Sequence, residues 1–343
     1  MIQLHNSMWP GIVGKGEGAE PIISLAKMID LTLGAQRDGK GFNGIDLNLM
    51  EPHVDINLDK AAIRHFADDI QAKGLQIGSV GAPIWPGTGG GSAMGSHQER
   101  KQFLDKVKKT CAFAQVLNDH GVRSYGSIRI DSADSPQRWA ESPLENSKKI
   151  SQTFKEAAII AADYGECLAA EGEICWASMH SWYHMLWLLE EVGMPEQLGF
   201  QADLAHTYLF LLGYNAAEYA LVEPNYSEEE FWEAYAKMTK ALAPWTVDFH
   251  VAQSNGTVFG SGSHDKTGRH CPANAADGKL DVVACARYWL LDEQGAIRNN
   301  IQHICWDGCM FPNAVLESAD TWDNVLALMQ RIQSDIAASQ HVK

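Results

Sequence analysis

The chain has 343 residues, of which 45% are hydrophobic, and a formal net charge of −16 at pH 7. A chain of this size and apolar content can bury a large core, either in one large α/β domain or in two ordinary domains. The excess of acidic residues argues against a broad surface for nucleic acid or anionic membrane, because such surfaces need lysine and arginine to neutralise phosphate.

The seven cysteines are odd in number and form no Cys-x-x-Cys pair. We therefore expect reduced thiols in a cytoplasmic protein, most of them buried, and no thiolate zinc site. The first residues do not combine a basic segment with a long apolar one, and no stretch of about 18 apolar residues occurs. We expect neither a signal peptide nor a membrane span.

Strand-like apolar runs alternate with helix-like periodic segments along the chain. The segment 98–119, for example, carries apolar residues at helical spacing from Phe103 to Leu117, and Gly121 provides its stop. Strands are predicted around 2–4, 44–50, 74–83 and 121–131, and then in four apolar runs that end at Glu171, Asp203, His250 and Asp307. Helices are predicted over 59–73, 98–119, 147–163, 228–242, 280–291 and 320–338.

Repeated strand-then-helix units with no charged linker predict an α/β fold, a single (β/α)8 TIM barrel that spans residues 1–343. Two long loops, 83–98 after the third strand and 255–279 after the seventh, follow the carboxyl ends of strands. Because the active site of such a barrel lies at that end, both loops are expected to overhang it, as lids or as plain flexible connections.

The four runs at strands five to eight each end in a potential metal ligand: Glu171, Asp203, His250 and Asp307. Their spacing is near or somewhat above the roughly 30 to 45 residues of one strand-helix unit, so all four are expected at the same end of the barrel. Three carboxylates and an imidazole suit Mn²⁺ or Mg²⁺ better than a metal that prefers thiolates.

Each proposed ligand also has an ordinary structural interpretation. Glu171 could pair with a buried Arg or Lys, and Glu173, which faces the same side of the strand, could be the ligand in its place. Asp203 could cap the next helix, His250 could be a hydrogen-bonded core residue, and Asp307, followed by a glycine, could belong to a turn.

Further residues are candidates for holding a substrate. His206 lies one helical turn beyond Asp203, and Arg269 and His270 lie in the second long loop, where Arg suits a planar anionic group. Trp85, Trp176 and Trp306 are candidates for the apolar walls of a sugar site, with core packing as the alternative for at least one of them.

The series Glu171, Asp203-x-x-His206, His250-x-x-Gln253, Asp265-x-x-Gly268-Arg269-His270 and Gly278-x-Leu280-Asp281 resembles the xylose isomerase-like TIM barrel superfamily. The superfamily includes sugar isomerases, ketose epimerases, inosose dehydratase and enzymes that cut abasic DNA. The resemblance implies one divalent ion, usually Mn²⁺ with Mg²⁺, Co²⁺ or Zn²⁺ as alternatives, held by Glu171, Asp203, His250 and Asp307.

In the isomerase and epimerase branches the first and last ligands are glutamates that also move protons, which implies catalytic roles for Glu171 and Asp307. Because Asp307 is one methylene shorter than a glutamate, Glu173 or a histidine is the alternative proton carrier.

The leading functional hypothesis is a metal-dependent isomerase or epimerase of a sugar or keto-sugar. Proton removal beside a carbonyl would give an ene-diolate that a divalent ion stabilises. The alternative is a lyase or dehydratase that acts on a keto-sugar or cyclitol after the same proton abstraction. We expect a small carbohydrate as substrate, a homo-oligomer, and no nucleic-acid or membrane partner. A hydrolase of abasic DNA is disfavoured by the charge and the short ligand series, and a sugar-binding barrel without catalysis is a further alternative.

Overall fold

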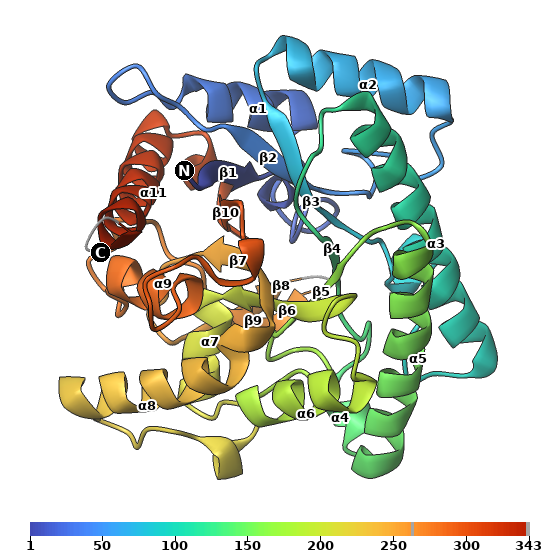
Figure 1. Cartoon of the computed structure of the whole chain (residues 1–343), viewed down its shortest axis with the longest axis vertical. Helices are drawn as coiled ribbons and strands as arrows, with labels where there is room; N and C mark the ends of the chain where they lie inside the picture. Colours follow the sequence, from blue (N-terminus) through green and yellow to red (C-terminus); the bar gives the residue numbers. More distant parts are fainter. Residues whose placement is uncertain (262–263, 341–343) are drawn as a thin grey trace.

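The computed structural model describes residues 1–261 and 264–340, without the side chains of 259–267 and Asn300. Eight parallel strands form a closed barrel in the order β1-β10-β7-β6-β5-β4-β3-β2, and helices surround it on all sides (Figure 1). The predicted (β/α)8 barrel is therefore confirmed. The barrel strands are β1 (Gln3–Ser7), β2 (Gly44–Asn48), β3 (Gln76–Gly81), β4 (Ile128–Ile130), β5 (Leu168–Glu171), β6 (Leu198–Asp203), β7 (Thr246–Val251) and β10 (His303–Trp306).

Most helices around the barrel begin at a residue whose side chain caps the first turn, for example Ser24 of α1 and Asp59 of α2. Ser96 and Glu99 form a reciprocal capping box at the start of α3, as do Ser227 and Glu230 at the start of α8. The α-helices are α1 (Leu25–Gly34), α2 (Lys60–Ala72), α3 (His97–His120), α4 (Pro136–Trp139), α5 (Pro143–Asp163), α6 (Trp182–Val192), α7 (Leu204–Leu211), α8 (Glu228–Leu242), α9 (Val282–Leu290), α10 (Asn313–Leu316) and α11 (Ala319–Gln340). Among the described residues, none of these helices combines the length and apolar character needed to cross a membrane.

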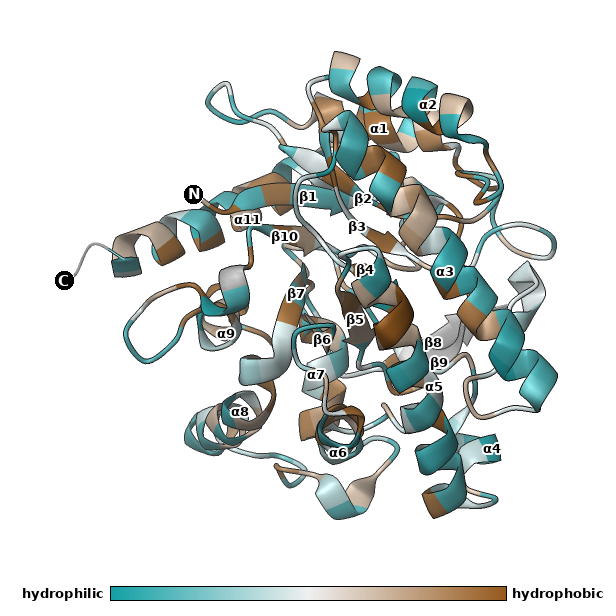
Figure 2. Cartoon of the chain, turned by 45° about the vertical axis from the view of Figure 1, so that its right-hand side comes forward, coloured by the Kyte–Doolittle hydropathy of each residue, from teal (hydrophilic) through white to brown (hydrophobic). Residues whose placement is uncertain are grey.

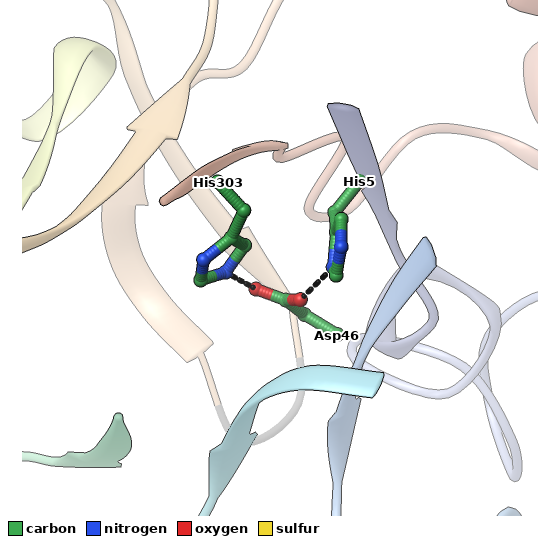
Figure 3. Close-up of side chains that lie close together, drawn as sticks. All are labelled: His5, Asp46 and His303. Carbon is green, nitrogen blue, oxygen red and sulfur yellow. Dashed lines mark hydrogen bonds and ion pairs between the residues drawn. The ribbon is translucent and has the colours of Figure 1, made fainter. Parts of the chain in front are cut away.

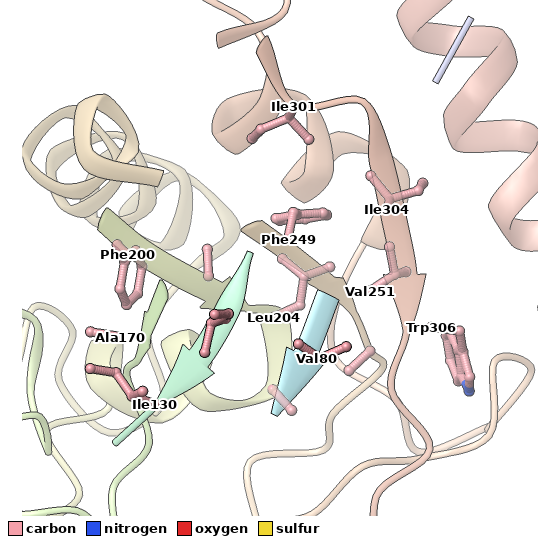
Figure 4. Close-up of a cluster of buried hydrophobic side chains, with 14 of the residues drawn as sticks. Val80, Ile130, Ala170, Phe200, Leu204, Phe249, Val251, Ile301, Ile304 and Trp306 are labelled. Carbon is pink, nitrogen blue, oxygen red and sulfur yellow. The ribbon is translucent and has the colours of Figure 1, made fainter. Parts of the chain in front are cut away.

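The hydrophobic core lies between the barrel and its helices. The apolar face of α3 is buried from Phe103 to Leu117, as predicted, and Figure 2 shows hydrophilic and hydrophobic residues mixed along α2 and α3, as in helices that bury one face. Figure 4 shows buried hydrophobic side chains of this core, among them Phe200 of β6, Phe249 of β7 and Ile304 of β10. Trp306 also belongs to this core and is fully buried, so the prediction that it could line a sugar site is corrected.

Strand alternation gives the barrel a polar interior. In β6 and β7 the polar residues alternate with apolar residues that belong to the core; these polar residues are Gln201, Asp203, Asp248 and His250. In β10 the polar residue His303 is followed by the apolar residue Ile304. Many barrels of this type fill their interior with branched aliphatic side chains. This one places hydrogen-bonding groups there instead, beneath the carboxyl ends of the strands.

Several local predictions differ from the structure. The fourth strand covers only Ile128–Ile130 rather than 121–131, and α1, α6 and α7 were not predicted. The loop 255–279 contains an antiparallel pair, β8 (Val258–Ser261) and β9 (His264–Gly268).

The loop 83–98 is buried over residues 90–94 and exposed at Pro86, Gly87 and Gly89. It contains the short 3-10 helix η2 (Pro86–Thr88). A Cβ on Gly90 would lie 1.9 Å from the Ile84 carbonyl oxygen, and one on Gly91 would lie 2.3 Å from that of Glu99. The glycines therefore serve close backbone packing.

Candidate functional site

A cavity of about 460 Å³ opens at the carboxyl ends of the strands, where the barrel fold places active sites. Its wall combines residues from the strand ends with residues from the loops that follow them. The lining comprises Trp9, Ile12, Val13, Asn48, Met50, Ser79, Gly81, Trp85, Pro86, Gly87, Thr88, Arg129, Ala133, Glu171, Glu173, Trp176, Gln201, His206, His250, Asp307 and Cys309.

Three of the four predicted metal ligands meet in this cavity. One ligand atom each from Glu171, His250 and Asp307 lies within 4.8 Å of the other two, and all three side chains are buried. His250 Nδ1 is 3.5 Å from Asp307 Oδ2 and 3.9 Å from Glu171 Oε1. These three residues come from β5, from β7 and from the end of β10, so the barrel register brings distant parts of the sequence to one place.

Asp307 has one oxygen fixed and one directed at the cluster. Its Oδ1 accepts hydrogen bonds from Trp9 Nε1 at 3.0 Å and from the Cys309 backbone N–H at 2.7 Å. Burial alone would raise the pKa of this carboxyl, but His270 and His250 hold it well below its usual value. Asp307 is thus both a turn residue and an anion that faces the cluster.

Asp203 lies in a second, adjacent group with His206 and His270. Its Oδ1 caps α7 through the backbone N–H groups of Ala205 and His206, at 2.7 and 3.0 Å. Asp203 is therefore a helix cap, the alternative interpretation of the sequence, and its second oxygen remains directed at the site.

His270 lies between Asp203 and Asp307. Its Nε2 is 3.4 Å from Asp203 Oδ2 and 3.9 Å from Asp307 Oδ2. Burial by itself would lower the pKa of His270, but these carboxylates raise it to about 9. In this arrangement a histidine cation lies between Asp203 and Asp307.

Arg129 on β4 is the main residue of the site that sequence reasoning missed. It donates to Glu171 Oε2 from Nε at 2.6 Å and also from Nη2, and to Asp131 Oδ2 from Nη1 at 2.8 Å. Burial disfavours its charge, yet the carboxylates around it raise its pKa further, so it is a permanent cation. The buried Arg pairing considered for Glu171 is thus present, through one oxygen only.

Glu173 and His206 line the cavity beside Arg129 and Glu171, and we call these four residues the charged wall. His206 Nε2 lies 3.8 Å from Glu173 Oε1 and 4.0 Å from Glu171 Oε1. Trp176 Nε1 donates to Glu173 Oε2 at 2.9 Å, and Trp176 lines the cavity as predicted from the sequence. Glu173 is not a member of the group formed by Glu171, His250 and Asp307, which favours Glu171 over Glu173 as the ligand.

One nitrogen of the His250 ring contacts Gln201, which lies on the neighbouring strand β6. Gln201 Nε2 lies 2.8 Å from His250 Nε2 and 2.8 Å from Asp248 Oδ2. The other ring nitrogen, Nδ1, is buried without a hydrogen bond among the described residues and points at the two carboxylates. This nitrogen can bind a metal ion once it has lost its proton. The ring then carries its proton on Nε2, and Gln201 must present its amide oxygen there.

A second histidine-carboxylate cluster lies deeper in the barrel (Figure 3). Asp46 bridges His5 and His303, through Oδ1 to His5 Nδ1 at 2.7 Å and through Oδ2 to His303 Nε2 at 3.1 Å. Tyr125 hydroxyl lies 3.0 Å from the other nitrogen of His5. Since each carboxylate oxygen already has an imidazole partner, we interpret this cluster as a polar floor that supports the site.

Two of the predicted substrate-binding residues lie outside the cavity. Neither Arg269 nor His270 is among the described residues that line it. Arg269 is 38% exposed and pairs with Asp277 at 3.3 Å, so its role in holding a substrate stays a prediction. The side chain of Asp265, which contributed to the family resemblance, lies outside the described residues.

Comparisons with known proteins agree with this architecture. The family model described as xylose isomerase-like TIM barrel matches residues 39–287, whereas no curated protein matches the chain. Similar solved structures include a D-tagatose 3-epimerase-like protein, at 12% identity and a TM-score of 0.61, with 98% of this chain and 100% of that chain covered.

Two further structures carry metals. The IOLI protein with a zinc atom is 12% identical, with a TM-score of 0.59 and 100% of both chains covered. A xylose isomerase-like TIM barrel protein from Mycobacterium smegmatis, in complex with magnesium, is 14% identical, with a TM-score of 0.60 and 98% of both chains covered. At such identities the structural likeness shows the fold, and the family model covers most of this chain. The chain therefore belongs to the xylose isomerase-like TIM barrel family.

Proposed function

We propose that this protein is a divalent-metal-dependent isomerase or epimerase of a sugar or keto-sugar. The observation that carries the proposal is the meeting of Glu171, His250 and Asp307 at the wall of the cavity, with His250 Nδ1 buried and directed at both carboxylates. An epimerase-like protein and two metal-bound proteins among the structural neighbours support it.

The charge of the cluster supports a bound cation. Besides Glu171 and Asp307, the carboxylates of Glu173 and Asp203 are buried beside the cavity, and Arg129 and the protonated His270 together balance only part of this charge. Buried anions are costly unless they are paired or bind a metal. Two carboxylates and an imidazole suit Mn²⁺, our first expectation, and also Mg²⁺, Co²⁺ or Zn²⁺.

A cation held by Glu171, His250 and Asp307 would polarise a substrate carbonyl and offset the charge that develops when a neighbouring carbon loses its proton. Glu173 lies beside the cluster without belonging to it, and we assign to it the role of taking that proton and returning it to the same or the adjacent carbon. His206 lies against both glutamates and can hold a substrate hydroxyl. Arg129 keeps one oxygen of Glu171 fixed, which leaves the other for the cluster.

The test combines metal analysis with isotope exchange. After dialysis, the wild-type protein should retain a divalent metal. It should also exchange carbon-bound hydrogen of at least one keto-sugar with D₂O and give only products that are isomers of the substrate. His250→Ala should lose both properties, whereas His65→Ala, whose side chain is 80% exposed on α2, should keep both. A wild-type protein without metal or exchange contradicts the proposal, and a dehydrated or cleaved product would indicate the lyase alternative.

A further inference from the structure

The cavity has two chemically different sides. Ile12 and Val13 follow β1, Met50 follows β2, and Cys309 follows β10, and these side chains belong to a small apolar cluster separate from the main core. Asn48 at the end of β2 and Asp307 after β10 are the polar residues on this side. In the closed barrel, β10, β1 and β2 are neighbours, and they lie directly opposite β4, β5 and β6. That opposite side carries the charged wall of Arg129, Glu171, Glu173 and His206.

The tryptophans of the cavity reinforce its apolar character. The indole N–H of Trp9 donates to Asp307, that of Trp85 to Asp131 at 3.0 Å, and that of Trp176 to Glu173. Each N–H is therefore already bound to a carboxylate, so a ligand meets mainly the carbon surface of these rings. Such surfaces bind aromatic and aliphatic groups well.

A free sugar, which carries hydroxyl groups around its whole ring, matches the apolar part of this cavity less well than a sugar with an apolar substituent. Sugar hydroxyls that lie against Ile12, Val13 and Met50 would be removed from water and would gain no hydrogen-bond partner there. Such desolvation is unfavourable. The volume of about 460 Å³ lies within the range of pockets that bind drug-sized ligands, which leaves room for a sugar with a substituent.

We propose that the substrate is a glycoside with an apolar aglycone, aryl or alkyl, that has been oxidised to a ketone at a ring carbon. The ring ketone would face Glu171, Glu173 and His206, and the aglycone would lie against Ile12 and Val13. The glycosidic bond locks the anomeric carbon, so the carbonyl must stand at another ring carbon. The proton that leaves the neighbouring carbon returns to it, which makes the step neutral in mass and in redox state. This inference rests on the proposed function.

The test compares exchange in D₂O for a free ketohexose and for the methyl, butyl and phenyl glycosides of a ring-oxidised hexose. We expect kcat/KM to rise from methyl to phenyl by about tenfold or more, since each buried methylene in an apolar pocket changes discrimination by roughly that factor. Val13→Asn should reduce the phenyl-to-methyl ratio. Ile159→Asn, which changes a half-exposed residue on the outer helix α5, should leave it as in the wild type.

The outcomes separate this inference from the proposed function. If free ketohexose exchanges as fast as the phenyl glycoside, the substrate class is wrong although the enzyme class stands. If no substrate exchanges, a binding measurement tests the aglycone site separately. Unoxidised phenyl glucoside is added to the protein, and the quenching of tryptophan fluorescence is followed. Quenching that Val13→Asn weakens and that free glucose does not produce would support the aglycone site, and equal signals from both ligands would overturn it.

Discussion

Replacing Arg129 by Met tests how the charge of the site is balanced. In the wild type, Arg129 donates to Glu171 and Asp131, and its Nη2 lies 3.9 Å from Glu173 Oε2. Met keeps most of the volume of the side chain but removes its charge. Three buried carboxylates would then lose their shared cation, without a large cavity to add a second effect.

The expected magnitude follows from the burial of the partners. Removing one member of a buried ion pair typically destabilises a protein by about 3 to 5 kcal/mol. A change of 1 kcal/mol shifts the unfolding temperature of a domain of 150 to 250 residues by about 2 to 4 °C, and by somewhat less in a larger chain. We therefore expect the metal-free Arg129→Met variant to unfold roughly 5 to 15 °C below the wild type.

The measurement is thermal unfolding followed by circular dichroism, in EDTA and then in excess Mn²⁺. Because a divalent cation would neutralise the same carboxylates, Mn²⁺ should raise the unfolding temperature more in Arg129→Met than in the wild type. Arg287→Met is the matched control: its pair with Asp335 is half-exposed and should contribute less than about 1 kcal/mol. An Arg129→Met protein that unfolds within about 2 °C of the wild type in EDTA would refute the reasoning.

Three further changes test individual side chains. Glu173→Gln should reduce hydrogen exchange by about 10²-fold or more while metal content is unchanged, and loss of the metal instead would make Glu173 a ligand. Gln201→Leu leaves His250 and Asp248 without their shared partner, so isothermal titration should show Mn²⁺ affinity about 10- to 100-fold lower, and an unaltered affinity would contradict this support role. The pKa of His270 is about 9 in the folded protein, above the usual 6.5, so its contribution to stability is fully present below pH 6.5 and is lost as the pH rises through 9. The unfolding temperature of metal-free wild type should therefore fall over this range more than that of His270→Gln, and parallel profiles would contradict the assignment.

The sequence predicted the barrel well because its strands and helices have strong, separate periodicities. The apolar face of α3 from Phe103 to Leu117 and the stop at Gly121 were found in this way. Polar residues at the ends of apolar strands also pointed to the part of the site that contains Glu171, His250 and Asp307. The short helix α7 was missed because all eight of its residues are buried, so it has no amphipathic pattern to detect.

The charge pairing of the site could not be predicted in the same way, because it depends on which strands become neighbours and in what register. Arg129 and Asp131 made the fourth strand unusually polar, and that was the available signal, but only the pairing of Arg129 with Ala169 on β5 brings the guanidinium to Glu171. The same holds for Asp203, which lies beside His250 in the sheet and contacts His270, a residue from a distant loop. The contact of His270 Nε2 with Asp203 Oδ2, at 3.4 Å, competes with a metal ion for that oxygen. We therefore expect a crystal structure with Mn²⁺ to show the ion on Glu171, His250 and Asp307, with His270 still beside Asp203. Asp203 in the first coordination sphere would contradict this expectation and would restore all four ligands predicted from the sequence.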